Sequence, residues 1–416
     1  MTTATAAELL GQSLQLPCGA TLPNRLAKSA MSEALGTPDQ RASAELATLY
    51  GRWADGGIGL SITGNVMVDR RALGEPGNVA IEDDRDLEQL PQWARAAKRK
   101  GGAVWMQLNH PGKQAPKGLN RETVAPSAVP FGAALRTYFA TPRALTDSEI
   151  LDIIARFGKA AAAAEQAGFD GVQIHGAHGY LVSQFLSPRH NTREDDWGGD
   201  AVRRRRFVIA IYQAMRAATK PGFAIGIKLN SADFQRGGFT EEESLEVMQA
   251  LDAEEIDLLE ISGGTYEAPK MAIGVEQKDT TKAREAYFFE FSEKARKVVK
   301  APLMVTGGFR TLQGMGEALQ SNALDIVGVA RPLALEPDAP NRWLQGVEAQ
   351  VQTPARIKTG IAAVDAMALM EVAFYARQLR KMGHGKDPQP DESPLKAAMA
   401  AVLGSGWKGL TRRLRA

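Results

Sequence analysis

Two histidines and a tyrosine follow a short apolar run in the stretch VQIHGAHGY, residues 172–180. A neutral imidazole can donate a hydrogen bond to a ligand oxygen, and each preorganised donor is worth roughly 3 kcal/mol toward a developing oxyanion. A phenol can deliver a proton to a basic carbon or oxygen. His175, His178 and Tyr180 are therefore candidate catalytic residues. The alternative is a pair of structural histidines whose ring nitrogens bond to the backbone.

Paired histidines could also bind a metal. A zinc site needs a third ligand, and the chain has neither an HExxH motif nor a cysteine cluster. Cys18 is the only cysteine, which excludes an intrachain disulfide and an iron–sulfur cluster held by several thiolates. We expect no metal site.

A glycine pair ends another apolar run, in LMVTGGFRTLQGM. Gly307 and Gly308 let the backbone approach an anion, and a helix that begins near Thr311 would point its free N–H groups at that anion. Arg331 follows the next apolar run and could add a bidentate contact. This pattern predicts a phosphate site.

Gln107 and Lys228 lie near the ends of two further apolar runs. An amide offers a donor and an acceptor together, which suits the edge of a heterocycle. A fixed cation suits a delocalised anion. Two other readings of Lys228 stay open, a structural ion pair and a Schiff-base amine.

Eight apolar runs alternate with helical patterns, as a (β/α)₈ barrel requires. The predicted strands are residues 26–30, 59–63, 103–108, 171–175, 223–229, 257–261, 303–306 and 325–329. The predicted helices are residues 44–55, 84–100, 147–167, 201–219, 241–255, 285–299 and 311–321. A doubly wound sheet would alternate in the same way, but the strand count and the chain length favour an α/β fold of the barrel type.

Three segments fall outside this repeat. LQLPCGATLPNR predicts an N-terminal β-hairpin over the bottom of the barrel, and residues 109–145 predict an excursion on the active-site side. We place the barrel domain at 1–345 and a C-terminal helical extension at 346–416. Apolar residues recur at helical spacing in this extension, at Ile361, Val364, Ala368, Val372, Tyr375 and Leu379.

The bulk properties indicate an ordinary globular protein. Fifty basic and 48 acidic residues give a net charge of +2, which argues for neither nucleic acid nor an anionic membrane as a partner. The N-terminus has no secretory h-region, and no run of about 20 apolar residues predicts a membrane span. We expect a cytoplasmic protein. Its basic end, GWKGLTRRLRA, reads as a solvated segment, although a subunit contact there and a homo-oligomer stay open.

Five stretches together resemble the old yellow enzyme family of FMN-dependent ene-reductases. They are PNRLAKSAMSE, MQLNHPGKQA, VQIHGAHGYLVSQFLSPRHNTREDDWGGDAVRRRRF, IKLNSADFQRGGF and VTGGFR followed by GVARP. The resemblance covers about residues 12–345. It implies a (β/α)₈ barrel with FMN at its mouth. The residues implied to surround FMN are Ala30, Met31, Ser32, Gln107, His175, Lys228, Gly307, Gly308, Phe309 and Arg331.

The resemblance also implies the reaction. NAD(P)H reduces the flavin, and an α,β-unsaturated carbonyl compound then accepts the hydride at its β-carbon. His175 and His178 would grip the carbonyl oxygen, and Tyr180 would protonate the α-carbon. Ser32 and Lys228 differ from the family's usual Thr or Cys and Arg, so the flavin potential and the range of substrates should differ too. A flavin-free lyase or aldolase that uses Lys228, and a non-catalytic flavin-binding sensor, are the alternatives.

Overall fold

Eight parallel strands form a closed barrel in the computed structural model, which describes residues 4–83, 85, 87–133, 135–263, 279–309, 311–347 and 369–393. They are β3 (Leu26–Lys28), β4 (Leu60–Met67), β6 (Ala103–Asn109), β9 (Gly171–Gly176), β10 (Ala224–Asn230), β11 (Leu258–Ser262), β12 (Leu303–Thr306) and β13 (Ile326–Val329). Pairing of β3 with both β13 and β4 closes the ring, which confirms the predicted (β/α)₈ barrel. The short strand β5 (Val79–Ala80) pairs with the far end of β4.

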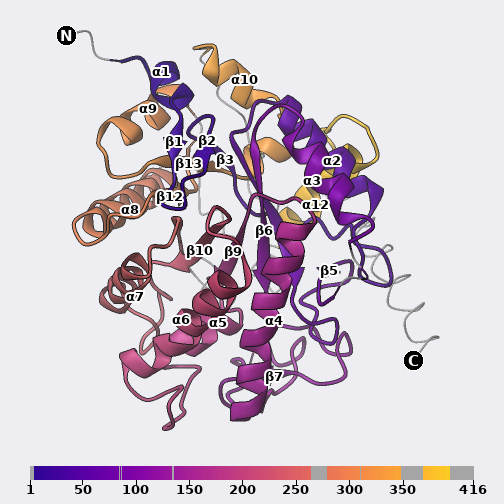
Figure 1. Cartoon of the computed structure of the whole chain (residues 1–416), viewed down its shortest axis with the longest axis vertical. Coiled ribbons are helices and arrows are strands. Elements are labelled where there is room, and N and C mark those ends of the chain that lie inside the picture. The colour runs from indigo at the N-terminus through magenta and orange to yellow at the C-terminus, as the bar shows by residue number, and fades with distance from the viewer. Residues whose placement is uncertain are drawn as a thin grey trace.

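Helices cover the outside of this ring (Figure 1). They are α2 (Ala44–Asp55), α3 (Leu90–Lys98), α4 (Asp147–Gln166), α6 (Ala201–Ala218), α7 (Glu241–Ala253), α8 (Asp279–Arg296), α9 (Leu312–Gln320), the 3₁₀ turn η2 (Arg331–Ala334) and α10 (Ala339–Leu344). Capping boxes begin α4 and α7: the hydroxyls of Thr146 and Thr240 each accept the N–H three residues on, and the glutamate there reaches back.

The N-terminal hairpin closes one end of the barrel. Strands β1 (Leu14–Gln15) and β2 (Thr21–Leu22) are antiparallel, and Leu16 and Leu22 pack against the apolar residues inside the ring. The N–H of Cys18 donates to Asp257, 2.7 Å away and directly before β11. The hairpin therefore lies at the amino ends of the strands, as predicted, and the carboxyl ends remain for the site.

One tryptophan fills much of the lower barrel. Trp105 is fully buried in a cluster with Leu60, Leu258 and other inward-facing side chains. Gly226 makes room for it, because a Cβ there would lie 2.8 Å from the indole ring and 3.0 Å from the carbonyl oxygen of Leu258. The interior is thus a packed core below the site.

The predicted strands agree with the structure to within two residues, except in β4. This strand was predicted to end at Thr63 but continues to Met67, with a register shift between Ile62 and Asn65. A bulge inserts an extra residue and lets the strand continue past polar residues that interrupt the apolar pattern. The expected strand end at Thr63 is therefore wrong.

Two helix predictions also differ at their starts. The helix predicted over 84–100 begins only at Leu90, because Pro91 suits the first turn, where backbone N–H groups need no intrahelical acceptor. The helix predicted from residue 285 is α8, which begins at Asp279. Two short helices, α1 (Ala6–Gly11) and α5 (Leu181–Leu186), were not predicted.

The excursion at 109–145 carries a small parallel pair, β7 (Val124–Ala125) with β8 (Arg143–Ala144). Arg193, in the loop beyond β9 and α5, donates to the carbonyl oxygens of Pro126 at 3.0 Å and Leu145 at 2.6 Å. These contacts tie the excursion to a loop that follows a carboxyl strand end.

The C-terminal helix α12 (Leu369–Gly383) packs against α2 and buries Phe374, Leu379 and Met382. It contains the predicted helical residues Tyr375 and Leu379. Residues 361, 364 and 368, the side chain of residue 372 and the basic C-terminal end lie outside the described part of the chain. The domain boundary at 345/346 stays a prediction.

We expect Gly226→Ala to lower the free energy of unfolding by about 1–3 kcal/mol, because the added methyl group would overpack the barrel against Trp105. Urea unfolding followed by tryptophan fluorescence measures the change. Gly222→Ala is the matched control, since nothing lies within 4 Å of its Cβ position and a change within about 0.5 kcal/mol is expected. Equal stability of the two variants would contradict this account of the core.

Candidate functional site

Six buried polar side chains form one layer across the inside of the barrel, above the apolar core. We call this set the polar layer: Ser29, Gln107, Gln173, Lys228, Glu260 and Thr306. Strand register pairs Gln107 with Gln173, and Lys228 with Glu260, on neighbouring strands. The hydrogen bond between Gln173 and Glu260 joins the two pairs. The predicted site residues Gln107 and Lys228 therefore belong to one hydrogen-bonded set inside the barrel.

Hydrogen bonds connect the whole layer. Gln107 Nε2 donates to Gln173 Oε1, and Gln173 Nε2 donates to Glu260 Oε2, each at 2.7 Å. Lys228 Nζ lies 2.9 Å from Glu260 Oε1, which also accepts the Thr306 hydroxyl at 2.6 Å. Buried charges need such partners, because an unpaired charge away from water is costly.

Lys228 therefore has the ion-pair partner that one of its readings required. The pair occupies the lumen, however, where a cation is also in reach of a ligand at the mouth. Gln173, Glu260 and Thr306 were not predicted. The sequence feature that could have identified them is a polar residue within a buried apolar strand, such as Glu260 in LLEIS.

His175 lies at the carboxyl end of β9, level with Lys228 on β10. Its Nδ1 accepts the N–H of Ala177 at 3.3 Å, so Nε2 carries the ring proton and can donate it to a ligand. Burial lowers the pKa of His175 well below its usual value, and the charge of Lys228 adds to the effect. The ring is neutral at neutral pH.

His178 lies beside His175, with ring centroids 5.2 Å apart. Its Nε2 lies 2.8 Å from the hydroxyl of Ser262, and its backbone N–H donates to Asn230 at 3.2 Å. Burial lowers its pKa to about 3, with a further contribution from Lys228. When Ser262 donates to Nε2, the ring proton is on Nδ1 and can reach a second acceptor.

Tyr180 forms the third corner, with its ring 4.7 Å from that of His175. It is the N-cap residue of α5, so the start of this helix fixes its position. Asn65 Nδ2 lies 3.4 Å from the Tyr180 hydroxyl, and Asn109 donates to Asn65 at 3.3 Å. Sequence analysis missed Asn65 because it lies beyond the bulge in β4.

The ends of β12 and β13 are adjacent strand ends, since Thr306 pairs with Gly328. Gly307 and Gly308 have φ angles of 121° and 89°, which suit glycine, and Arg331 begins η2, shortly after the end of β13. Two successive glycines at one strand end and an arginine after the adjacent strand are residue types that can hold the phosphate of FMN through backbone N–H groups and a guanidinium. Phe309 follows in this turn, half-buried.

Ala30, Met31 and Ser32 follow β3 as a half-buried segment. The next residue, Glu33, accepts the N–H of Gly64 in the bulge at 2.9 Å and the hydroxyl of Tyr50. Tyr50 in turn accepts Lys28 Nζ at 2.8 Å.

Lys28 is itself buried and also donates to the carbonyl oxygen of Ile62 at 2.6 Å. Burial lowers the pKa of Lys28 to about 7. These contacts anchor both ends of the segment 30–32 to the barrel.

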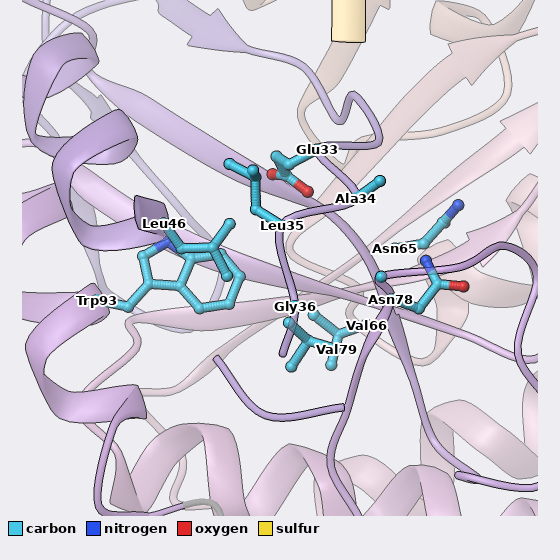
Figure 2. A pocket seen from close by; sticks show the side chains of 11 residues that line it. Glu33, Ala34, Leu35, Gly36, Leu46, Asn65, Val66, Asn78, Val79 and Trp93 are labelled. Carbon is cyan, nitrogen blue, oxygen red and sulfur yellow. The ribbon is translucent and has the colours of Figure 1, made fainter. Parts of the chain in front are cut away.

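A small cavity lies beside this segment, lined by Glu33, Leu35, Asn65, Asn78 and Trp93 among others (Figure 2). Its volume is about 10 Å³, which is room for one water molecule at most. It is therefore too small for a flavin or an organic substrate.

Among the described residues, no helix is both long and apolar enough to cross a bilayer. In the same residues, no cluster of three potential metal ligands occurs.

Comparisons with known proteins identify the family of this chain. The model of the NADH:flavin oxidoreductase / NADH oxidase family matches residues 15–350. The NADH-dependent flavin oxidoreductase iliE of Hypocrea jecorina is 37% identical over 350 residues, which cover 79% of this chain and 86% of that protein. The protein of the same name from Neonectria sp. is 36% identical over 355 residues, and the match covers 79% of this chain but 46% of that protein.

A solved structure shares the fold. The old yellow enzyme homologue from Zymomonas mobilis superposes with a TM-score of 0.70 at 25% identity, over 82% of this chain and 94% of that one. The chain therefore belongs to the NADH:flavin oxidoreductase / NADH oxidase family, the family of old yellow enzyme, whose cofactor is FMN and whose hydride donor is NAD(P)H.

Proposed function

We propose that this oxidoreductase is an ene-reductase that reduces the C=C bond of α,β-unsaturated carbonyl compounds. The observation that carries the proposal is the grouping of His175, His178 and Tyr180 at one strand end, level with Lys228. Two neutral donors and a phenol are the groups that a carbonyl oxygen and a nearby carbon need.

FMN, when bound, supplies the hydride that it has taken from NAD(P)H. The protein holds the substrate and manages the proton. Nε2 of His175 and a ring nitrogen of His178 donate hydrogen bonds to the carbonyl oxygen, which draws electron density away from the β-carbon. The β-carbon then accepts the hydride. Tyr180 gives its proton to the α-carbon, so one hydride and one proton are added across the C=C bond.

The other predicted residues would hold the cofactor. Gln107 offers its amide to the pyrimidine edge, and Lys228 offers positive charge where the reduced ring carries negative charge. The segment Ala30–Ser32 would lie along one face of the ring. The turn Gly307–Phe309 and Arg331 would hold the phosphate.

The lyase alternative is less well supported. A Schiff-base lysine must release its proton to attack a carbonyl, whereas Lys228 lies 2.9 Å from the buried carboxylate of Glu260. Membership of an FMN family also argues against a flavin-free reaction.

The general test is aerobic turnover of a panel of small enones with NADH or NADPH, followed by release and mass identification of the flavin. Reduced product from at least one enone supports the proposal. Rapid oxidation of NADH without reduction of any enone would instead favour a plain NADH oxidase. A slow reaction with both nicotinamides would favour the sensor.

We expect Tyr180→Phe to slow enone reduction by about 10²-fold or more, because the α-carbon loses its proton donor. Reduction of the flavin by NAD(P)H needs no proton from Tyr180 and should stay within about threefold of wild type. Stopped-flow absorbance measures the two half-reactions separately. An equal loss in both would assign Tyr180 a structural role.

We expect His175→Ala with His178→Ala to weaken phenol binding by about 10²-fold, because a phenolate oxygen imitates the enolate oxygen that both rings would hold. Titration of the charge-transfer band with a substituted phenol gives the affinity. An unchanged affinity and band would exclude the pair from the oxygen site.

The same titration has an expected pH dependence. Burial lowers the pKa of His178 to about 3 and that of His175 below its usual value, so neither ring gains a proton between pH 7.5 and 5.5. We therefore expect the two imidazoles to contribute no change in phenol affinity over this range in wild type. A transition near pH 6.5 that disappears in the double variant would show that a ring does titrate there.

A further inference from the structure

Every hydrogen bond in the polar layer has its direction set by Glu260. We propose that Glu260 is a positioning residue which, through Gln173, determines which end of the Gln107 amide faces the flavin. The inference rests on the proposed placement of the flavin against Gln107. It assigns roles to Glu260 and Gln173, neither of which touches the cofactor in that placement.

The starting point is the carboxylate. Glu260 is fully buried, and its two oxygens can only accept hydrogen bonds. Oε1 accepts from Lys228 at 2.9 Å and from the Thr306 hydroxyl at 2.6 Å, and Oε2 accepts from Gln173 at 2.7 Å. Each partner must therefore present an N–H or O–H group to it.

The direction then passes along the layer. Gln173 must turn its Nε2 toward Glu260, so its Oε1 points to the other side. That oxygen accepts Gln107 Nε2 at 2.7 Å, and Gln107 must in turn point its nitrogen inward. The orientation of a glutamine amide is often ambiguous. It is fixed here because the series of hydrogen bonds begins at Glu260, whose carboxylate can only accept.

The consequence lies at the mouth. With Nε2 committed to Gln173, Gln107 keeps its Oε1 and the second N–H of Nε2 for a ligand. The pyrimidine edge of an isoalloxazine presents one N–H, at N3, between two carbonyl oxygens. An inward Nε2 leaves Oε1 available to accept from N3–H, whereas a reversed amide would commit Oε1 to the layer.

A second branch of the layer provides an internal control. Thr306 donates its only proton to Glu260, so Ser29 must be the donor in the 2.7 Å bond between the two hydroxyls. This branch ends at Ser29 and does not lead to Gln107. Thr306→Val therefore removes one hydrogen bond from Glu260, as Gln173→Met does, but leaves the relay to Gln107 intact.

The experiment uses the purified full-length protein reconstituted with FMN labelled with ¹⁵N at N3. The N3–H signal in ¹H–¹⁵N spectra reports the hydrogen bond, and fluorescence quenching gives the FMN dissociation constant. The variants are Gln173→Met, Glu260→Gln, Thr306→Val and Gln107→Leu. Gln173→Met keeps the ion pair and a similar volume, so it carries the test if Glu260→Gln does not fold.

We expect Gln173→Met to shift or broaden the N3–H signal and to weaken FMN binding by about three- to tenfold, the effect of one hydrogen bond. Glu260→Gln should change the signal in the same way. Thr306→Val should leave both readouts near wild type. An unchanged signal in Gln173→Met overturns the relay when Gln107→Leu still changes it.

Equal losses in Gln173→Met and Thr306→Val, without a change in the signal, would reduce Glu260 to a structural role and also overturn the inference. If Gln107→Leu itself leaves the signal unchanged, Gln107 does not face N3. The proposed placement of the flavin then fails together with the relay, whereas the family's use of FMN stands.

Discussion

The buried ion pair between Lys228 and Glu260 is the constraint on which the upper half of the barrel depends. Two opposite charges in a closed lumen are tolerable only when their remaining hydrogen-bonding positions are filled. Gln173 and Thr306 fill those of the carboxylate, and their own requirements bring in Gln107 and Ser29. An apolar core lies below this layer, and the polar mouth lies above it.

The barrel brings these groups together because its strands are parallel and staggered in a fixed register. Lys228 pairs with His175 on one neighbouring strand and with Glu260 on the other. Burial lowers the pKa of both imidazoles, and the charge at the floor of the mouth adds to this effect, so both rings are neutral. The same arrangement of strands thus places a cation, Lys228, at the floor of the mouth and two neutral donors, His175 and His178, at its wall.

Much of the fold could be predicted from sequence, because the spacing of apolar residues and the turn residues between them determine strand and helix positions locally. The mouth residues His175, Tyr180 and Gln107 were predictable because each follows or ends an apolar run. Glu260 and Gln173 were missed because their role depends on the residues that they contact across the inside of the barrel, which are distant in sequence. The space for Trp105 beside Gly226 is likewise a contact between distant segments, which no single window of sequence contains.

The bulge in β4 has a consequence for which side chains this strand turns inward. Leu60 and Ile62 belong to the interior cluster, and Asn65 reaches Tyr180 from the same strand. Even-numbered positions face inward before the irregularity and an odd-numbered one faces inward after it, so the inward-facing positions change parity between Ile62 and Asn65. One strand thus contributes apolar side chains to the core at one end and a polar side chain to the mouth at the other. The length of this strand therefore does not determine which of its side chains face the mouth, because the bulge sets that choice.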